Sequence, residues 1–215
     1  MKERGMIFNG EMVRAILDGR KTQTRRIMAP QPEPCPRGGH WWPSNVFKTM
    51  LHVEDEMQNG KGGWGGLVGD ACPFGDVGDR IWVREAFASG LSTKSTLAYR
   101  ATHKREDLED GFYDTIKWTP SIHMPRWASR ILLEITGVRV ERLNAISEED
   151  ARAEGIIDGG CLNCGEPEPC GCANPEPDAT DAFAYLWQSI YGQESWNADP
   201  WVWVIEFKRV EGGAA

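Results

Sequence analysis

Helical periodicity is clearest near the C-terminal end of the chain. Apolar residues within 181–191 recur at intervals of three and four, which predicts an amphipathic helix. Residues 9–19 show the same spacing and predict a shorter helix, with Asn9 placed to cap its N-terminus. A third short helix is predicted from Ser147, because a serine followed three residues later by an acid is typical of a capping box; it ends near Gly155.

Alternating and β-branched segments predict the strands. Residues 80–87 alternate between an apolar and a mixed face, and residues 130–143 are rich in β-branched side chains, with Gly137 at a predicted bulge or bend. The predicted strands are residues 21–27, 80–87, 96–101, 130–143 and 201–210. Long intervening segments separate these strands, and the sequence shows no regular βαβ alternation. We therefore predict the α+β class, with a small mixed β-barrel and flanking short helices.

Two stretches rich in Pro and Gly interrupt this pattern. Residues 28–77 and 158–178 show little periodicity and are predicted to be long loop insertions on a smaller core. The whole chain has 215 residues, of which 40% are hydrophobic, which suits a single domain over residues 1–215 that carries these insertions.

The distribution of apolar residues excludes two other classes. No stretch approaches the length of about 20 apolar residues that a membrane span requires. The N-terminal sequence MKERGMIF lacks the apolar core of a signal peptide, so we expect a cytoplasmic protein.

The net charge of −8 is concentrated in one segment. Residues 148–181 contain ten acids and a single base, Arg152, so the rest of the chain is close to neutral. Residues 14–26 are instead basic. This distribution disfavours a uniformly basic nucleic-acid binder, while a local basic patch for a nucleotide or a short strand remains compatible with it.

Four of the six cysteines lie within twelve residues, with the spacing C-x2-C-x5-C-x-C. Thiolates at such spacings can surround one tetrahedral ion, so Cys161, Cys164, Cys170 and Cys172 are candidate ligands of a structural zinc. The alternative is a surface loop with free thiols. Disulfides are not expected in a chain without a secretory signal, and no organic cofactor is expected either.

Several motifs together resemble the ASCH domain family, a relative of PUA-type RNA-binding barrels. They are GRKTQTRR at residues 19–26, GDRIWVRE at residues 78–85 and VIEFK at residues 204–208. The sequence IHMPRWASRI at residues 122–131 makes the chain particularly similar to prophage-encoded ASCH proteins. The resemblance implies a PUA-like barrel with a central cleft, and the two insertions are departures from it.

The resemblance also implies a catalytic site. The family includes a small bacterial amidohydrolase that removes acetyl from acetylcytidine with a Lys-x-x-Thr pair and a distant Glu. Lys21 and Thr24 match the pair within KTQT, and Glu154 matches the acid by its place in the short helix that follows the long strand. Glu148 or Glu149 is the alternative if that alignment shifts.

These residue types suit amide hydrolysis, which needs a nucleophile, a base and an acid for the leaving amine. A threonine hydroxyl is inert alone, so the lysine must be able to lose its proton. Burial or nearby positive charge from Arg25 and Arg26 would lower the pKa of Lys21 accordingly. Residues three apart in a strand point to opposite faces, so Lys21 and Thr24 converge only if a turn or bulge separates them or Lys21 belongs to the loop.

Aromatic and basic residues suggest contacts with a base and its phosphate. The candidate substrate-binding residues are Arg25, Arg26, Trp82, Arg84, His123 and Arg126. Most of the other tryptophans are expected to lie in the core or to anchor loops.

Four functional alternatives follow. The first is hydrolysis of an amide on a modified, acetylcytidine-like base by Lys21, Thr24 and Glu154. The second is a non-catalytic module that binds single-stranded RNA, with GRKTQTRR on phosphates and Trp82 stacked on a base. A ribonuclease of phage origin is the third, and an interaction protein held by the zinc loop is a further one. The sequence leaves protein partners open.

Overall fold

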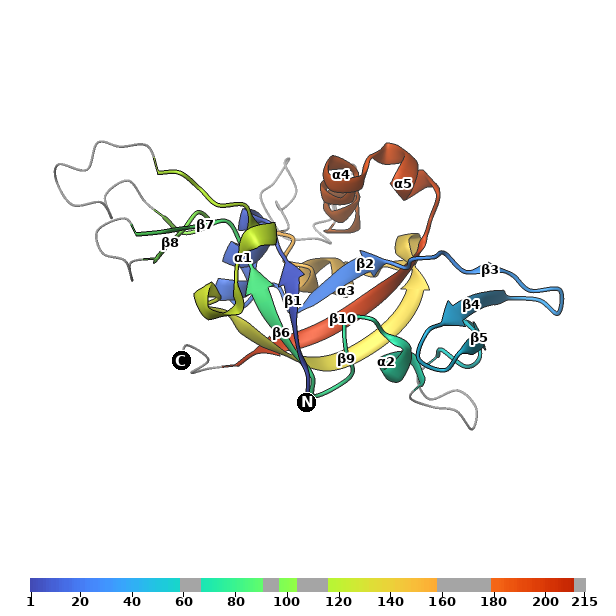
Figure 1. Cartoon of the computed structure of the whole chain (residues 1–215). Helices are drawn as coiled ribbons and strands as arrows, with labels where there is room; N and C mark the ends of the chain where they lie inside the picture. Colours follow the sequence, from blue (N-terminus) through green and yellow to red (C-terminus); the bar gives the residue numbers. More distant parts are fainter. Residues whose placement is uncertain (59–66, 91–96, 104–115, 158–178, 211–215) are drawn as a thin grey trace, which may run out of the picture.

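The computed structural model describes residues 1–58, 67–90, 97–103, 116–157 and 179–210 (Figure 1). It contains short helices and strands of very different lengths. The strands are β1 (Glu3–Ile7), β2 (Gln23–Ile27), β3 (Glu33–Pro34), β4 (His40–Ser44), β5 (Thr49–His52), β6 (Arg80–Arg84), β7 (Phe87–Ser89), β8 (Leu97–Tyr99), β9 (Leu132–Arg142) and β10 (Trp201–Arg209). The α-helices are α1 (Gly10–Leu17), α2 (Leu67–Ala71), α3 (Glu148–Ala153), α4 (Ala179–Tyr191) and α5 (Gln193–Asn197).

The main sheet has five strands in the order β1-β6-β9-β10-β2. β1 pairs with β6 in parallel, and the other neighbours are antiparallel. The fold is therefore mixed α+β, as predicted. The predicted irregularity at Gly137 is also confirmed: the β9–β10 register shifts there, because Glu206 pairs with Gly137 while Phe207 pairs with Ile135.

The predicted closed barrel is not confirmed. β1 and β2 are the two edges of the sheet and share no ladder of backbone hydrogen bonds in the described structure. A side chain connects them instead: Nη2 of Arg26 on β2 donates to the carbonyl oxygen of Ile7 on β1 at 2.8 Å. The sheet is thus strongly curved, with its edges joined by a guanidinium group.

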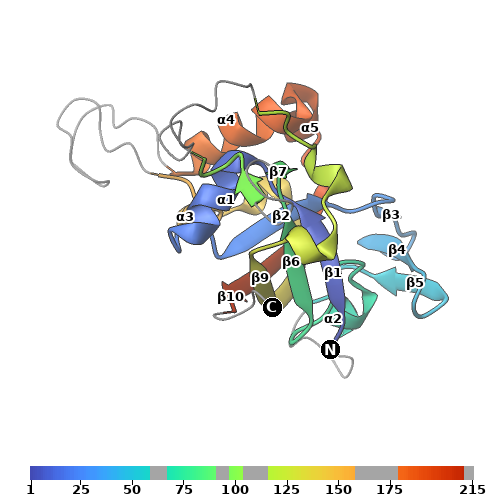
Figure 2. The same cartoon turned by 60° about the vertical axis from the view of Figure 1, so that its left-hand side comes forward.

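The three predicted helices all form. The side chain of Asn9 accepts from the backbone N–H of Met12 and caps α1, and Ser147 caps α3 by accepting from Asp150. α4 spans the predicted amphipathic segment and buries Phe183 and Trp187. Figures 1 and 2 place α4 and α5 on one side of the sheet. The C-terminal end of α3 lies close to α1, since a Cβ on Gly155 would be 2.8 Å from the Cβ of Ala15.

Part of the predicted insertion at residues 28–77 is regular structure, which corrects that prediction. β3, β4 and β5 form a separate antiparallel sheet that lies beside the main one in both views (Figures 1 and 2). It packs on the core through the Trp42 ring, whose centroid lies 5.4 Å from that of Trp203 on β10. Pro43 lies inside β4, beyond the two residues that pair with β3, and a proline within a segment argues against a strand in pattern analysis.

Two other boundaries differ from the predictions. β1 is not predicted, because charged residues and Gly5 interrupt its sequence. Gly5 is required by packing: a Cβ there would lie 2.5 Å from the Trp82 ring. The predicted hairpin of residues 80–87 and 96–101 exists only at its end, where β7 pairs with β8 after β6 has terminated at Arg84.

The sheet separates two apolar clusters. Trp203 and Ile205 of β10 belong to the larger one, which includes residues of α1, β1 and β6. Val202 and Val204 point to the opposite face and pack with Phe183 and Trp187 of α4. Among the described residues, no helix has the length and apolar character needed to cross a membrane.

Candidate functional site

The predicted residues Lys21 and Glu154 form a buried ion pair. Nζ of Lys21 lies 2.5 Å from Oε2 of Glu154 and also donates to the Glu154 carbonyl oxygen at 2.8 Å. The side chains of Lys21 and Glu154 are 0% and 4% exposed. The two residues are also paired through an isolated β-bridge, so backbone and side chains hold them in the same arrangement.

The local sequence explains how they meet. Gly19 adopts a left-handed conformation (φ 77°) after α1, and the N–H groups of Arg20 and Lys21 both donate to the Ala15 carbonyl. Lys21 therefore belongs to the turn between α1 and β2 rather than to the strand. Gly155 follows Glu154 with φ 93°, and a Cβ on it would lie 2.8 Å from the Cβ of Ala15. Only glycine allows this close approach.

Arg25 completes the buried cluster. Its guanidinium is wholly inaccessible and contacts three carboxylates: Glu141 at 2.5 Å, Asp150 at 3.0 Å and Glu154 at 3.4 Å. It also lies 5.7 Å from the ring centroid of Phe183 on α4. Its Nη1 and Nη2 atoms donate to these carboxylates, which suits Arg25 to orient Glu154, and its burial leaves a phosphate no access to it.

Burial lowers the pKa of Lys21, and the positive charges of Arg26 and Arg25 lower it further, although the carboxylate of Glu154 opposes the shift. This is the direction predicted from the sequence. A lysine amine with a lowered pKa loses its proton more readily, and Glu154 is placed at hydrogen-bond distance to take or return that proton.

Thr24 lies nearby but on a different face of β2. It pairs with Ile205, whose side chain belongs to the larger core, whereas Arg25 pairs with Val204, which packs toward α4. The Thr24 side chain is buried. Since β2 is an edge strand, both of its faces border the same free edge, and Thr24 and Glu154 line one cavity along it.

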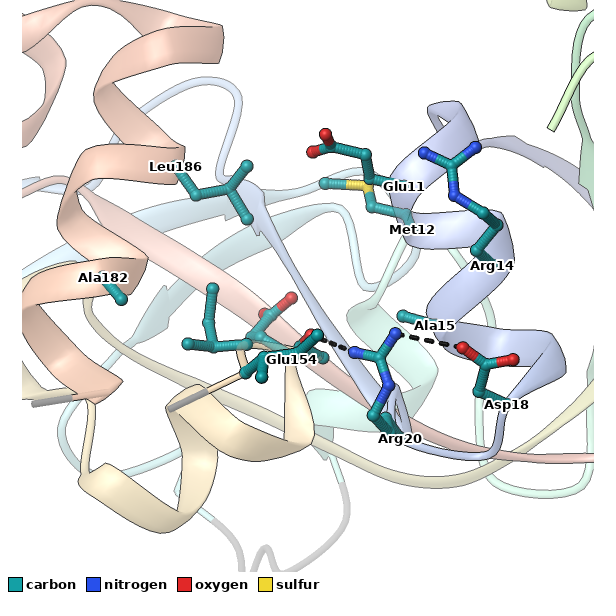
Figure 3. Close-up of a pocket in the computed structure, with 12 residues that line it drawn as sticks. Glu11, Met12, Arg14, Ala15, Asp18, Arg20, Glu154, Ala182 and Leu186 are labelled. Carbon is teal, nitrogen blue, oxygen red and sulfur yellow. Dashed lines mark hydrogen bonds and ion pairs between the residues drawn. The ribbon is translucent and has the colours of Figure 1, made fainter. Parts of the chain in front are cut away.

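This inner cavity has a volume of about 20 Å³, enough for little more than one water molecule. A larger outer cavity of about 400 Å³ lies between α1 and α4. In Figure 3, Glu154 and Arg20 lie at its base, with Met12 of α1 facing Leu186 of α4 across it. Met12, Glu154 and Leu186 line both cavities and therefore separate them.

The remaining predicted substrate-binding residues lie in two other places. Arg26 is half-buried, with its guanidinium 5.3 Å from the Phe8 ring centroid, and it lines the inner cavity. Arg84 lies 5.3 Å from the Trp82 ring centroid and donates to the Ile122 carbonyl oxygen. These two residues are close together, as predicted, but on β6, near the opposite edge of the sheet from β2.

The segment around residues 121–128 borders this second region. His123 is exposed, and Arg126 pairs with Glu3 of β1 at 2.9 Å. Beside them Trp127 is 69% exposed and Ile122 is 60% exposed. The structure thus brings Trp82, Arg84, His123 and Arg126 to one side of the β1 edge, separate from the Lys21–Glu154 pair.

The cysteines of the predicted zinc site, Cys161, Cys164, Cys170 and Cys172, fall outside the described residues. Within the described ranges, no group of three or more His, Cys, Asp or Glu side chains is placed to hold a metal ion. Cys35 and Cys72 are buried free thiols.

Sequence analysis missed several members of the site. Asp150 accepts hydrogen bonds from Arg25 and Arg139. Glu141, which lies on β9, accepts from the same two arginines. Met12 and Leu186 separate the two cavities. One signal was present: Asp150 and Glu154 are four residues apart and therefore lie on one face of the α3 segment. No sequence pattern relates Glu141 to Arg25, because their contact depends on how β9, β10 and β2 are paired.

Comparison with family models, curated proteins and solved structures found no match to this chain. The ASCH resemblance therefore rests on the sequence motifs, and the functional argument rests on the geometry of the site.

Proposed function

We propose that this chain hydrolyses an amide on an acylated cytidine-like base, on a PUA-like scaffold, with Lys21, Thr24 and Glu154 as its catalytic residues. The single observation that carries the proposal is the buried Lys21–Glu154 pair, whose Glu154 lines a cavity of about 400 Å³. Fully buried ionic pairs are costly to maintain, and strongly perturbed lysines cluster at functional sites. The KTQT motif supplies the threonine beside them.

In the proposed reaction, the base occupies the outer cavity with its acyl group directed toward Glu154. The neutral amine of Lys21 accepts the proton of the Thr24 hydroxyl as its oxygen bonds to the amide carbonyl carbon. The carbon–nitrogen bond then breaks, and the leaving amine receives the proton from Lys21. Water hydrolyses the resulting ester on Thr24, which releases a carboxylic acid. Glu154 orients Lys21 throughout by its hydrogen bond.

Two features of the site set a condition on this mechanism. The inner cavity is too small for an acyl group, and Thr24 points to the other face of β2 from Arg25. Productive binding therefore requires Met12 and Leu186 to move apart, so that the acyl group reaches the edge of β2. Both side chains are only partly buried, and Met12 packs at the margin of the larger apolar cluster.

The test is release of cytidine from acetylcytidine by the purified protein. We expect turnover in the wild type, and a loss of at least about a hundredfold in Lys21→Met and Thr24→Ala. Thr22→Ala is the matched control within the same motif, since Thr22 is exposed, and it should keep full activity. Circular dichroism checks that each variant is folded.

Two results would contradict the proposal. An inactive wild-type protein would contradict amide hydrolysis on this base. Equal activity of Thr24→Ala and Thr22→Ala would exclude Thr24 as the nucleophile and assign that role to a water molecule beside Glu154.

A second function, binding of single-stranded RNA, is favoured by a specific observation: Trp127 is exposed, and the neighbouring Arg126 pairs with Glu3 of β1. Aromatic rings and arginines at one surface suit bases and phosphates. This function predicts oligonucleotide binding that weakens with salt, falls about tenfold in Trp127→Ala and is unchanged in Thr24→Ala.

The cysteine cluster adds a proposal of its own, which rests on its spacing. We propose that Cys161, Cys164, Cys170 and Cys172 bind one structural zinc ion. Metal analysis of the purified protein should find about one equivalent, lost in Cys161→Ser with Cys164→Ser. Metal-free protein with four freely alkylated thiols would contradict it.

A further inference from the structure

A second cavity, of about 320 Å³, lies on the other side of α1 from the outer cavity described above. The start of α1 and the turn after β8 form its walls, and the buried residue Glu85 also lines it. Its polar lining residues are Asn9, Arg14, Glu85, Arg100 and Ser121. None of these residues has a role in the proposed reaction.

The charges of this cavity are unequally compensated. The buried carboxylate of Glu85 is held at both oxygens by Arg130, at 2.9 and 3.0 Å, so it is neutralised by a partner. Arg14 donates to the Ala101 carbonyl at 2.9 Å, which orients its guanidinium without neutralising it. Arg100 makes no side-chain hydrogen bond or ion pair with the described part of the chain. Two positive charges therefore remain at the cavity.

Arg14 also lines the outer cavity, so the two cavities meet at this residue. A ligand with a planar base in the outer cavity would carry its phosphate toward Arg14. Arginine guanidinium groups bind phosphate oxygens with paired, charge-assisted hydrogen bonds. The hydroxyl of Ser121 provides a further neutral donor at the same cavity.

We propose that the cavity of Arg14, Arg100 and Ser121 binds the phosphate of a nucleotide whose base lies in the outer cavity. The inference rests on the proposed function, because it names the substrate class of the same site: a phosphorylated cytidine rather than the free nucleoside. The phosphate is either the monoester of a mononucleotide or the diester of an RNA strand.

Calorimetric titration of the full chain with cytidine, cytidine 5′-monophosphate and the dinucleotide CpC tests this proposal. We expect the monophosphate to bind at least about tenfold more tightly than cytidine, and Arg100→Ala to remove that advantage. Arg37→Ala is the matched control, because it removes one exposed positive charge far along the sequence in the β3–β4 turn. It should leave the affinity within about twofold. Arg100→Ala should also reduce the slope of the logarithm of the affinity against the logarithm of the salt concentration by the contribution of about one phosphate contact.

The outcomes separate this proposal from the proposed function. Equal affinity for cytidine and its monophosphate, absence of binding by both, or equal effects of Arg100→Ala and Arg37→Ala would overturn the phosphate site. Turnover of acetylcytidine is measured separately and can succeed or fail in each case. Tighter binding of CpC than of the monophosphate would assign the site to an internal diester of RNA, and the reverse would assign it to a monoester.

Discussion

Two buried carboxylates near α1 are neutralised in different ways. Glu154 pairs with Lys21, and their side chains are 4% and 0% exposed. Glu85 is equally buried, but its partner Arg130 is 25% exposed and binds it through two parallel hydrogen bonds. Arg130 also lies 4.0 Å from the ring centroid of Tyr99, which holds its plane in position.

The difference lies in the chemistry of the cation. Arginine does not lose its proton in proteins, so the Glu85 pair is a fixed anchor between β6 and the segment before β9. Lysine can lose its proton when it is buried, and the pKa of Lys21 is lowered by that burial. Two ion pairs of similar burial thus have different capacities: one can only hold charge, whereas the other can also transfer a proton.

The largest expected effect is a difference between the two ion pairs in how much stability is lost when the carboxylate is replaced. Glu154→Gln leaves Lys21 without a counter-charge in a fully buried site, and we expect a loss of about 3–5 kcal/mol in the free energy of unfolding at neutral pH. Glu85→Gln leaves Arg130, which reaches solvent, so the expected loss is about 1–3 kcal/mol. Urea denaturation measures both, and equal losses would contradict the comparison.

The glycine beside Glu154 provides the next test. Gly155→Ala combines a positive φ with a Cβ 2.8 Å from Ala15 and 3.1 Å from the Cβ of Lys21. We expect it to destabilise the protein by about 3 kcal/mol. Gly192→Ala is the matched control: its φ is 85°, but the space around it is open, so about 1 kcal/mol is expected. Similar losses of stability for the two variants in thermal denaturation would show that the close packing of Gly155 against Ala15 and Lys21 does not fix the position of Lys21.

The lowered pKa of Lys21 predicts a pH dependence. Between that pKa and the ordinary value of 10.5, the unfolded chain holds a proton that the native protein has lost, so the free energy of unfolding rises with pH. The slope reaches about 1.4 kcal/mol per pH unit for one proton. Lys21→Met should remove this rise, which we would measure as the difference between wild-type and variant denaturation curves.

The thiol of Cys72 is expected to change the free energy of unfolding with pH in the opposite direction, so it serves as the control for Lys21. Burial raises the pKa of its thiol from 9.0 to about 11, so between these values the native protein retains a proton that the unfolded chain has lost. The free energy of unfolding therefore falls with pH in that window. Cys72→Ala should remove the fall and leave the contribution of Lys21 intact. Identical changes in slope for both variants would contradict the assignment.

The smallest expected effect concerns geometry. Arg130→Lys keeps the positive charge beside Glu85 but loses one of the two parallel hydrogen bonds and the stacking on Tyr99. We expect a loss of about 1 kcal/mol in the free energy of unfolding, with unchanged pH dependence near neutrality. A larger pH-dependent loss would indicate that this pair, too, responds to protonation.

Local sequence signals predicted the helices and their caps well. The capping residues Asn9 and Ser147 act as expected because a cap involves atoms only three residues apart. The bulge at Gly137 was predicted for a similar reason. β1 and the small sheet of β3–β5 were not predicted, since their stability comes from distant partners such as Trp82 and Trp203 rather than from their own pattern.

The capped helices, most of the long strands and the residue types of the candidate site could be predicted from the chain alone, because these depend on near neighbours and on motif composition. The packing of distant segments was needed to reveal that Lys21 and Glu154, 133 residues apart, form one buried pair, and that Thr24 lines a small cavity with Glu154. It also decided that Arg14 and Arg100 share a cavity. Burial and charge pairing arise from the packing of remote segments, and no local pattern encodes them.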